Sequence, residues 1–134
     1  MNRTNLRHRK KRGTATAELA VCLPLIVFLI LGGMEAANGV FLKQGLTVTA
    51  YETAKLATTV GFTTAEAQAR GEQILIARGY TGGTITMDPP DPASLPPGTQ
   101  VTVTVAAPAA ANSISPIIHY GGTQVSARIV MNRN

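Results

Sequence analysis

The sequence predicts an α+β protein, in which a long amino-terminal transmembrane helix continues into a small extracytoplasmic domain with a second helix and a three-stranded antiparallel sheet. Three observations support this prediction. An apolar run without formal charge separates Glu18 from Glu35. A helical periodicity without proline follows over residues 35–60, and a capping pattern then begins another helix. The remainder of the chain holds three short segments in which apolar and polar residues alternate, as in half-buried strands.

Length and charge limit the classes of protein to consider. A chain of 134 residues has room for one anchor and one small domain. The formal net charge is +5, but residues 3–12 hold six of the twelve basic residues and no acid. A nucleic-acid-binding domain would carry its basic groups on one face of the fold, whereas these form a short tail before an apolar segment. We therefore expect no nucleic-acid partner.

The apolar run is long enough to cross a membrane. Counted from Thr14 to residue 34, it corresponds to roughly 31 Å of helix, and a bilayer core is about 30 Å thick. The basic cluster before it should remain in the cytoplasm, by the positive-inside rule. The prediction is a single-pass protein of the cytoplasmic (inner) membrane, with a cytoplasmic leader at 1–13, a transmembrane helix at 14–38 and an extracytoplasmic domain at 39–134.

A plain anchor does not explain Glu18, because a charge near the centre of a membrane helix costs about 2.5 to 3.5 kcal/mol, and less near its end. A cleavable secretory signal ending near residues 37–39 leaves this acid without a role. A lipoprotein signal would need Cys22 after the apolar stretch, but most of that stretch follows it. Cleavage between Gly13 and Thr14 instead keeps the whole run in the mature protein, with Glu18 as its fifth residue.

Such a cleavage would also supply a partner for the acid. The new α-amino group, with an unperturbed pKa of about 7.7 to 8.0, is largely protonated at neutral pH and can pair with Glu18 of an adjacent subunit. The alternative is a Glu18 that reaches headgroup water or caps the first helical turn.

The residues around this site resemble a known pattern. Gly13, four small residues, Glu18 and an apolar helix resemble the G-x-x-x-x-E processing site of type IV pilin-like proteins. The segment RGTATAELAVCLPLIVFLILGGMEAANG, from Arg12 to Gly39, resembles the opening of TadE-like pseudopilins of tight-adherence (Tad) pilus systems. Leu19 departs from the aromatic residue that many relatives carry after the Glu, which favours a minor subunit over the major pilin.

This resemblance implies a set of partners and roles. A prepilin peptidase would cut after Gly13 on the cytoplasmic side, and Glu18 would serve assembly. The partners would be the membrane, other pilin or pseudopilin subunits and the pilus assembly machinery. Pilin-like proteins also pack a long helix on a small antiparallel sheet, which agrees with the fold class predicted from the residues.

Small residues mark the carboxyl end of the apolar run. Gly32 with Ala36, and Gly33 with Ala37, form two overlapping small-x-x-x-small pairs that would let helices approach closely. The alternative is local flexibility where the chain leaves the membrane.

The first helix should continue beyond the membrane, with a break expected near Gly39 or Gly45 because glycine lowers helix propensity. Residues with helical spacing form its apolar stripe: Leu42, Leu46, Thr49, Thr53, Leu56 and Val60. Thr63 and Glu66 form a capping-box pattern for a second helix over residues 64–78, closed by Gly79. Its apolar side is expected to include Ala65, Ala69, Ile76 and Tyr80.

Three strands are predicted from alternation. Their apolar faces are Ile85 and Met87; Val101, Val103 and Val105; and Val125, Ala127, Ile129 and Met131. Residues 88–98 hold five prolines and predict an extended, solvated loop. Residues 107–123 form a long connection, which should include a short helical turn or a partner contact.

The sequence shows no catalytic constellation. After residue 60 the chain has one histidine, His119, and no cysteine. The four acids there are Glu66, Glu72, Asp88 and Asp91, and their spacing with His119 fits neither a metal site nor a catalytic triad. We expect no enzyme, cofactor or metal, and a surface position for His119. Two functions remain open: a processed pseudopilin or assembly component of a Tad pilus, and a secreted or anchored small binding domain whose apolar segment is only a signal or tether.

Overall fold

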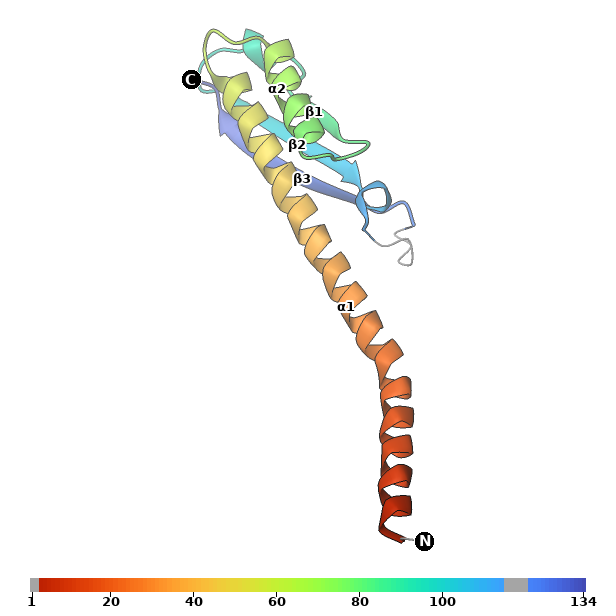
Figure 1. Cartoon of the computed structure of the whole chain (residues 1–134). Coiled ribbons are helices and arrows are strands. Elements are labelled where there is room, and N and C mark those ends of the chain that lie inside the picture. Colours follow the sequence, from red (N-terminus) through yellow and green to blue (C-terminus); the bar gives the residue numbers. More distant parts are fainter. Residues whose placement is uncertain (1–2, 115–120) are drawn as a thin grey trace. The chain divides into compact units, whose positions relative to one another are not determined.

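The computed structural model describes residues 3–114 and 121–134, with side chains from residue 13 onward. Its elements are α1 (Arg3–Thr58), α2 (Thr64–Ala77), β1 (Thr84–Asp88), the 3-10 turn η1 (Pro92–Ser94), β2 (Gln100–Pro108), the 3-10 turn η2 (Ala110–Asn112) and β3 (Gln124–Asn132). Figure 1 labels the two α-helices and the three strands. The predicted α+β class is confirmed: a long apolar helix, a second helix and a three-stranded antiparallel sheet.

The chain divides into two compact units, residues 1–36 and residues 37–134, and α1 contributes to both. In the first unit α1 is unbroken at Pro24, and its large apolar side chains from Leu19 to Met34 are exposed except for Leu31, which is half-buried. An 18-residue window of this helix has a mean hydropathy of 2.3, with none of the window buried. Within the described residues this is the one helix long and apolar enough to cross a membrane, which supports a single-pass membrane protein.

In the second unit α1 runs without interruption past Gly39 and Gly45, so the expected break is wrong. Tertiary packing outweighs the lower propensity of glycine here, because the aromatic ring of Tyr80 occupies the space where a Cβ of Gly45 would lie. The predicted stripe is buried at Leu42, Leu46, Thr49 and Thr53, while Val60 lies beyond the end of the helix and is exposed. Three alanines widen the buried face: Ala50, Ala54 and Ala57.

The ends of α2 agree with the prediction. The Glu66 N–H donates to the Thr63 hydroxyl at 3.2 Å, and the Thr63 N–H donates to the Glu66 carboxylate at 2.8 Å, which completes the capping box. Gly79 follows the helix in the left-handed region, with φ of 71°.

The predicted buried face of α2 is wrong. Ala67, Gly71 and Leu75 are buried, whereas Ala65, Ala69 and Ile76 are exposed and Tyr80 is half-buried. The cause is a close approach at Gly71: a Cβ there would lie only 2.5 Å from Ile85 Cδ1 and would also collide with the hydroxyl of Thr53. The face of α2 that packs on the domain is therefore the one with glycine, the smallest residue, at its centre. Counting apolar side chains along the helix does not predict this face.

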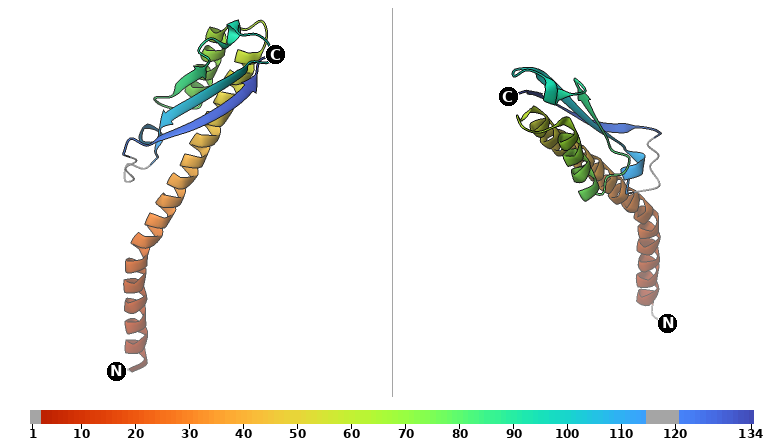
Figure 2. Two further views of the ribbon diagram at one scale, coloured as in Figure 1. Left: turned by 180° about the vertical axis from the view of Figure 1, so that it is seen from behind. Right: turned by 90° about the horizontal axis from the view of Figure 1, so that it is seen from above.

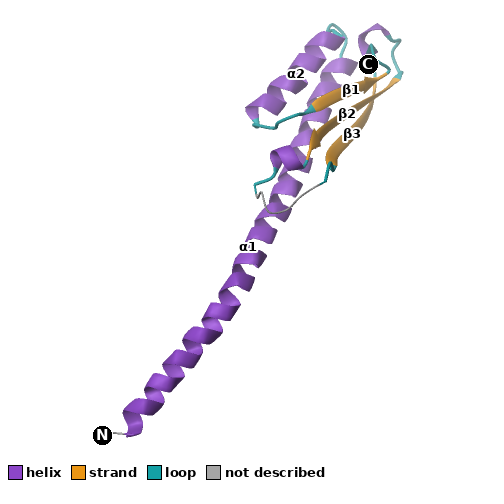
Figure 3. Cartoon of the chain, turned by 90° about the vertical axis from the view of Figure 1, so that its right-hand side faces the viewer, coloured by secondary structure: helices purple, strands orange, loops and turns teal. Residues whose placement is uncertain are grey.

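The sheet has the order β1-β2-β3, with both pairs antiparallel. In the central strand Val101, Val103 and Val105 are fully buried, and the predicted alternation holds in all three strands. Figure 2 shows α2 and the second-unit part of α1 against one face of the sheet, and Figure 3 shows the strands in order beside them. The domain thus has two layers, with its core between helices and sheet.

The loop at 88–98 is less solvated than predicted. Pro92 is fully buried, its carbonyl accepts a hydrogen bond from the Arg133 guanidinium, and the Thr64 hydroxyl donates to the Asp91 carboxylate. These contacts hold the loop against the start of α2 and the end of the chain. The prediction used proline stiffness alone, which says nothing about the surface on which a stiff loop packs.

The connection over 107–123 contains the predicted short helical turn, η2. Asn112 at its end bonds to the chain around Thr81: its amide donates to the Thr81 carbonyl at 3.0 Å and accepts from the Thr81 N–H at 2.8 Å. The Asn38 amide of α1 donates to the Asn112 carbonyl at 2.7 Å. His119 lies outside the described residues.

Candidate functional site

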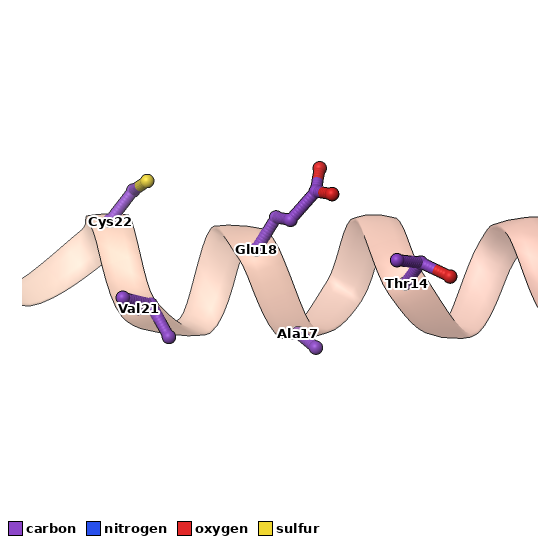
Figure 4. Close-up of a pocket in the computed structure, with 5 residues that line it drawn as sticks. All are labelled: Thr14, Ala17, Glu18, Val21 and Cys22. Carbon is purple, nitrogen blue, oxygen red and sulfur yellow. The ribbon is translucent and has the colours of Figure 1, made fainter.

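The predicted assembly residue, Glu18, lies on the exposed apolar part of α1. Residues four apart on a helix share a face, and Figure 4 shows the Glu18 carboxylate and the Cys22 thiol projecting from the same side. Ala17 and Val21 project from the opposite side in that view. The surroundings of the carboxylate are therefore small or apolar side chains.

Together with Thr14, these side chains line an open hollow on the surface of a single helix. A hollow of this kind does not enclose a ligand or exclude water, so it is unsuited to catalysis. It offers one negative charge on a helix surface that is otherwise apolar. The arrangement is suited to contact with another helix or with lipid headgroups.

The carboxylate of Glu18 has no hydrogen bond or ion pair within the part of the chain that the structure describes. Taking an ionised carboxylate out of water without a partner is costly, and in membrane helices such groups usually meet a counter-charge. The Glu18 carboxylate would therefore need hydration by water at the membrane surface, or a counter-charge from the trimmed amino terminus or from another molecule.

Gly13, five residues before Glu18, is not required by the fold. It is exposed in a helix, and a Cβ added there would have no atom within 4 Å. Glycine inside a helix costs about 1 kcal/mol relative to alanine. A residue that costs helix stability and fills no packing role is consistent with recognition by another protein.

The small-residue pairs at the end of the run are open surface. Gly32 and Gly33 would each accept a Cβ without a contact within 4 Å, and Ala36 and Ala37 are exposed. Helix packing at these residues involves a second helix and stays a prediction.

Two charged residues of α1 have surroundings that the sequence did not indicate. Glu35, expected only to mark the end of the apolar run, is 3% exposed. The Lys43 ammonium donates to the carbonyl of Ser126 in β3, 83 positions along the chain. Contacts over such separations have no local sequence signal. The one partial signal for the burial of Glu35 was its position as a charged residue next to a membrane segment.

Among the described residues, no group of three or more His, Cys, Asp or Glu side chains is placed to hold a metal ion. The acids of the second unit instead serve local structure. Glu66 caps α2, Asp91 bonds to Thr64, and Glu72 accepts from the Gln68 amide at 3.0 Å.

Comparison with known proteins gives a match to a family model. The family model described as TadE-like protein matches residues 13–55. The match begins at Gly13, includes Glu18 and ends inside the part of α1 that packs on the domain. The match spans 43 of the 134 residues, confirms the resemblance found in the sequence and suggests a protein associated with Tad pili. No curated protein and no solved structure matches the chain.

Proposed function

We propose that the chain is a membrane-inserted minor pseudopilin or assembly component of a Tad-type (type IVb, Flp) pilus or secretion system, trimmed by a prepilin peptidase between Gly13 and Thr14. One observation carries the proposal: the TadE-like match begins at a glycine that the fold does not need, five residues before an exposed carboxylate on an apolar helix. Trimming would leave this helix intact at the amino terminus of the mature protein.

The basic cluster at residues 3–12 supports an orientation. Positive charge before a membrane helix favours retention on the cytoplasmic side, so the second unit would lie outside the cytoplasm and the scissile bond inside it. In this orientation the cut would lie beside the cytoplasmic face of the inner membrane, and the folded domain would lie on the other side.

In this proposal, Glu18 acts after the cut. The new amino group of Thr14 carries a positive charge at neutral pH, and a neighbouring subunit presents its Glu18 carboxylate at a similar depth. Pairing lowers the cost of two isolated charges in a medium of low dielectric constant, so the contact favours subunits in register over subunits apart. Contacts at the pairs Gly32 with Ala36 and Gly33 with Ala37 would bring the helices close enough for it.

Substitution of Glu18 tests this role. Glu18→Ala should still insert into the membrane and still be trimmed, because removing a charge makes residence in lipid easier by up to about 3 kcal/mol. Surface fibres and co-purification with other pilus subunits should be lost, since the partner amine then has no counter-ion. The measurements are membrane content, the mass of the mature chain and fibre counts by electron microscopy.

A matched control separates position from charge. The double variant Ala17→Glu with Glu18→Ala keeps the net charge and composition of the segment but turns the carboxylate by about 100° around the helix. It should fail to assemble as Glu18→Ala does. Glu35→Ala is unsuitable as a neutral control, because Glu35 is buried. Normal fibres from Glu18→Ala would contradict the pairing and leave Glu18 as an interfacial residue.

A further inference from the structure

β3 is an edge strand, and its free side is the side that does not pair with β2. The backbone groups on this free side have hydrogen-bond partners at the two ends of the strand, and those between have none among the described residues. The N–H of Ala109 donates to the Thr123 carbonyl at 2.9 Å and the N–H of Arg133 donates to the Thr99 carbonyl at 2.8 Å, and both bonds continue the β2–β3 register. In an antiparallel pair every second residue bonds across to its partner strand. The odd-numbered residues of β3 therefore bond to β2, and the even-numbered ones direct their N–H and C=O groups to the free side.

Contacts with α1 close the ends of this free side. The Lys43 ammonium donates to the Ser126 carbonyl, and the Asn134 N–H donates to the Thr58 carbonyl at 3.1 Å. Between them, Arg128, Val130 and Asn132 are exposed, and within the described chain their outward backbone groups have no hydrogen-bond partner. The window, defined by these unpartnered groups, runs from the Arg128 N–H to the Asn132 carbonyl.

The opposite edge of the sheet, β1, offers the complementary groups. Because β2 uses its odd-numbered residues for β3, its even-numbered residues bond to β1, where Thr84, Thr86 and Asp88 are their partners in register. Ile85 and Met87 then direct their N–H and C=O groups away from the sheet. No described residue bonds to these backbone groups.

We propose that β1 of a second copy of this chain adds in parallel beside β3 and continues the sheet from one subunit to the next. The N–H of Ile85 would donate to the Arg128 carbonyl and accept, at its own carbonyl, the Val130 N–H. The N–H of Met87 would donate to the Val130 carbonyl, and its carbonyl would accept the Asn132 N–H. This ladder lies within the window between the contacts of Lys43 and Asn134 and uses the Arg128 carbonyl, both groups of Val130 and the Asn132 N–H.

The side chains agree with this register. Ile85 falls beside Ile129 and Met87 beside Met131, and all of these lie on the apolar face that the helices cover. Thr86 falls beside Val130 on the exposed face. A shift by one residue would turn apolar side chains to the solvent, so the apolar pattern fixes the register.

The direction of the strands favours this contact over pairing of β3 with itself. β1 and β3 run in the same direction in the sheet, so a parallel contact keeps α1 of successive copies pointing the same way, as one membrane requires. A two-fold β3–β3 pair would be antiparallel and would reverse α1 in one copy. The β3–β1 contact is head-to-tail and leaves a free edge at each end, so it can extend over many subunits.

The inference deepens the proposed assembly role and rests on it only in requiring that copies meet side by side in the membrane. Its test is disulfide cross-linking of the full chain in membranes, in a Cys22→Ser background, with Thr86→Cys and Val130→Cys combined. Air oxygen, with copper phenanthroline as catalyst, accepts the electrons and protons of the two thiols. Within one chain these positions lie two strands apart, roughly 10 Å, beyond the reach of a disulfide, whereas in the proposed contact they are neighbours.

The double-cysteine chain should give dimers and higher oligomers that a reductant returns to monomer, and neither single-cysteine chain should cross-link. Adding Asn132→Pro, which removes one donor of the proposed ladder and none of the β2–β3 pairs, should reduce the cross-linked fraction about fivefold relative to Asn132→Ala. Dimers from Val130→Cys alone would show a β3–β3 contact and overturn the proposal, as would absence of cross-links in the double-cysteine chain.

The amino terminus of the same samples separates this inference from the proposed function. Chains that begin at Thr14 but do not cross-link reject the sheet contact and leave the processing intact. Chains that cross-link with an uncut amino terminus reject the processing and support the sheet contact.

Discussion

At the scale of single residues, glycines have different structural roles in the two units. Gly13 fills no packing role, whereas Gly71 lets α2 approach α1 so closely that the Thr53 hydroxyl is buried without a hydrogen-bond partner among the described residues. Such a buried, unsatisfied hydroxyl costs on the order of 1 to 3 kcal/mol. The close packing of the helices and the sheet offsets this cost.

Gly71→Ala should therefore destabilise the domain, although alanine is the better helix former. A gain of about 1 kcal/mol in helix propensity is opposed by overpacking against Thr53 and Ile85, which typically costs about 1 to 3 kcal/mol. Thermal unfolding of the domain over residues 37–134 measures the change. The control is Gly39→Ala, where a Cβ meets no atom within 4 Å and the domain should become more stable.

Thr53→Ala makes the test specific. Combined with Gly71→Ala, it removes one of the clashing atoms together with the unsatisfied hydroxyl, so most of the lost stability should return. Equal stabilisation by Gly71→Ala and Gly39→Ala would show that the helices do not meet at Gly71.

At the scale of elements, local signals predicted what local interactions determine. The capping box at Thr63 and Glu66, the alternation in each strand and the presence of a long apolar helix are set by neighbouring residues, and each was predicted correctly. The buried face of α2 and the docking of the loop at Pro92 depend on contacts between residues that are distant in the sequence, and the sequence did not predict them. The site at Gly13 and Glu18 stays a prediction, and the sequence could suggest it because the two residues form a short-range motif.

The capping box also predicts a pH dependence. Hydrogen bonds from the Thr63 N–H and the Thr63 hydroxyl lower the pKa of Glu66 below its ordinary value. A carboxyl group whose pKa is lower in the folded state contributes stability that is present above its unfolded pKa, about 4.3, and is lost as the pH falls through the folded value.

Urea unfolding of residues 37–134 between about pH 6 and about pH 3 measures this loss. Glu66→Gln should remove its share, so the midpoint of the variant should fall less steeply with acidification than that of the wild type. Thr63→Ala should cost about 1 kcal/mol at neutral pH through the lost cap. Parallel pH curves for wild type and Glu66→Gln would contradict a capping role of the ionised carboxylate.

At the scale of the whole molecule, the chain joins an apolar helix without cover to a domain that has its own core. The TadE-like match spans the transition, from Gly13 to the part of α1 that carries Leu42 and Leu46. This part of α1 anchors the domain, since its buried side chains form much of the core.

The mass of the mature amino terminus tests the central claim most directly. Purified from membranes of cells that assemble the pilus, the wild-type chain should begin at Thr14, and Gly13→Val should accumulate uncut, because a residue with a branched side chain replaces the most permissive backbone position beside the scissile bond. A mature chain beginning near residues 37–40 would indicate a secretory signal, and an intact Met1 a simple anchor. Either result, or normal trimming of Gly13→Val at Thr14, would contradict the assignment of Gly13 as the processing site.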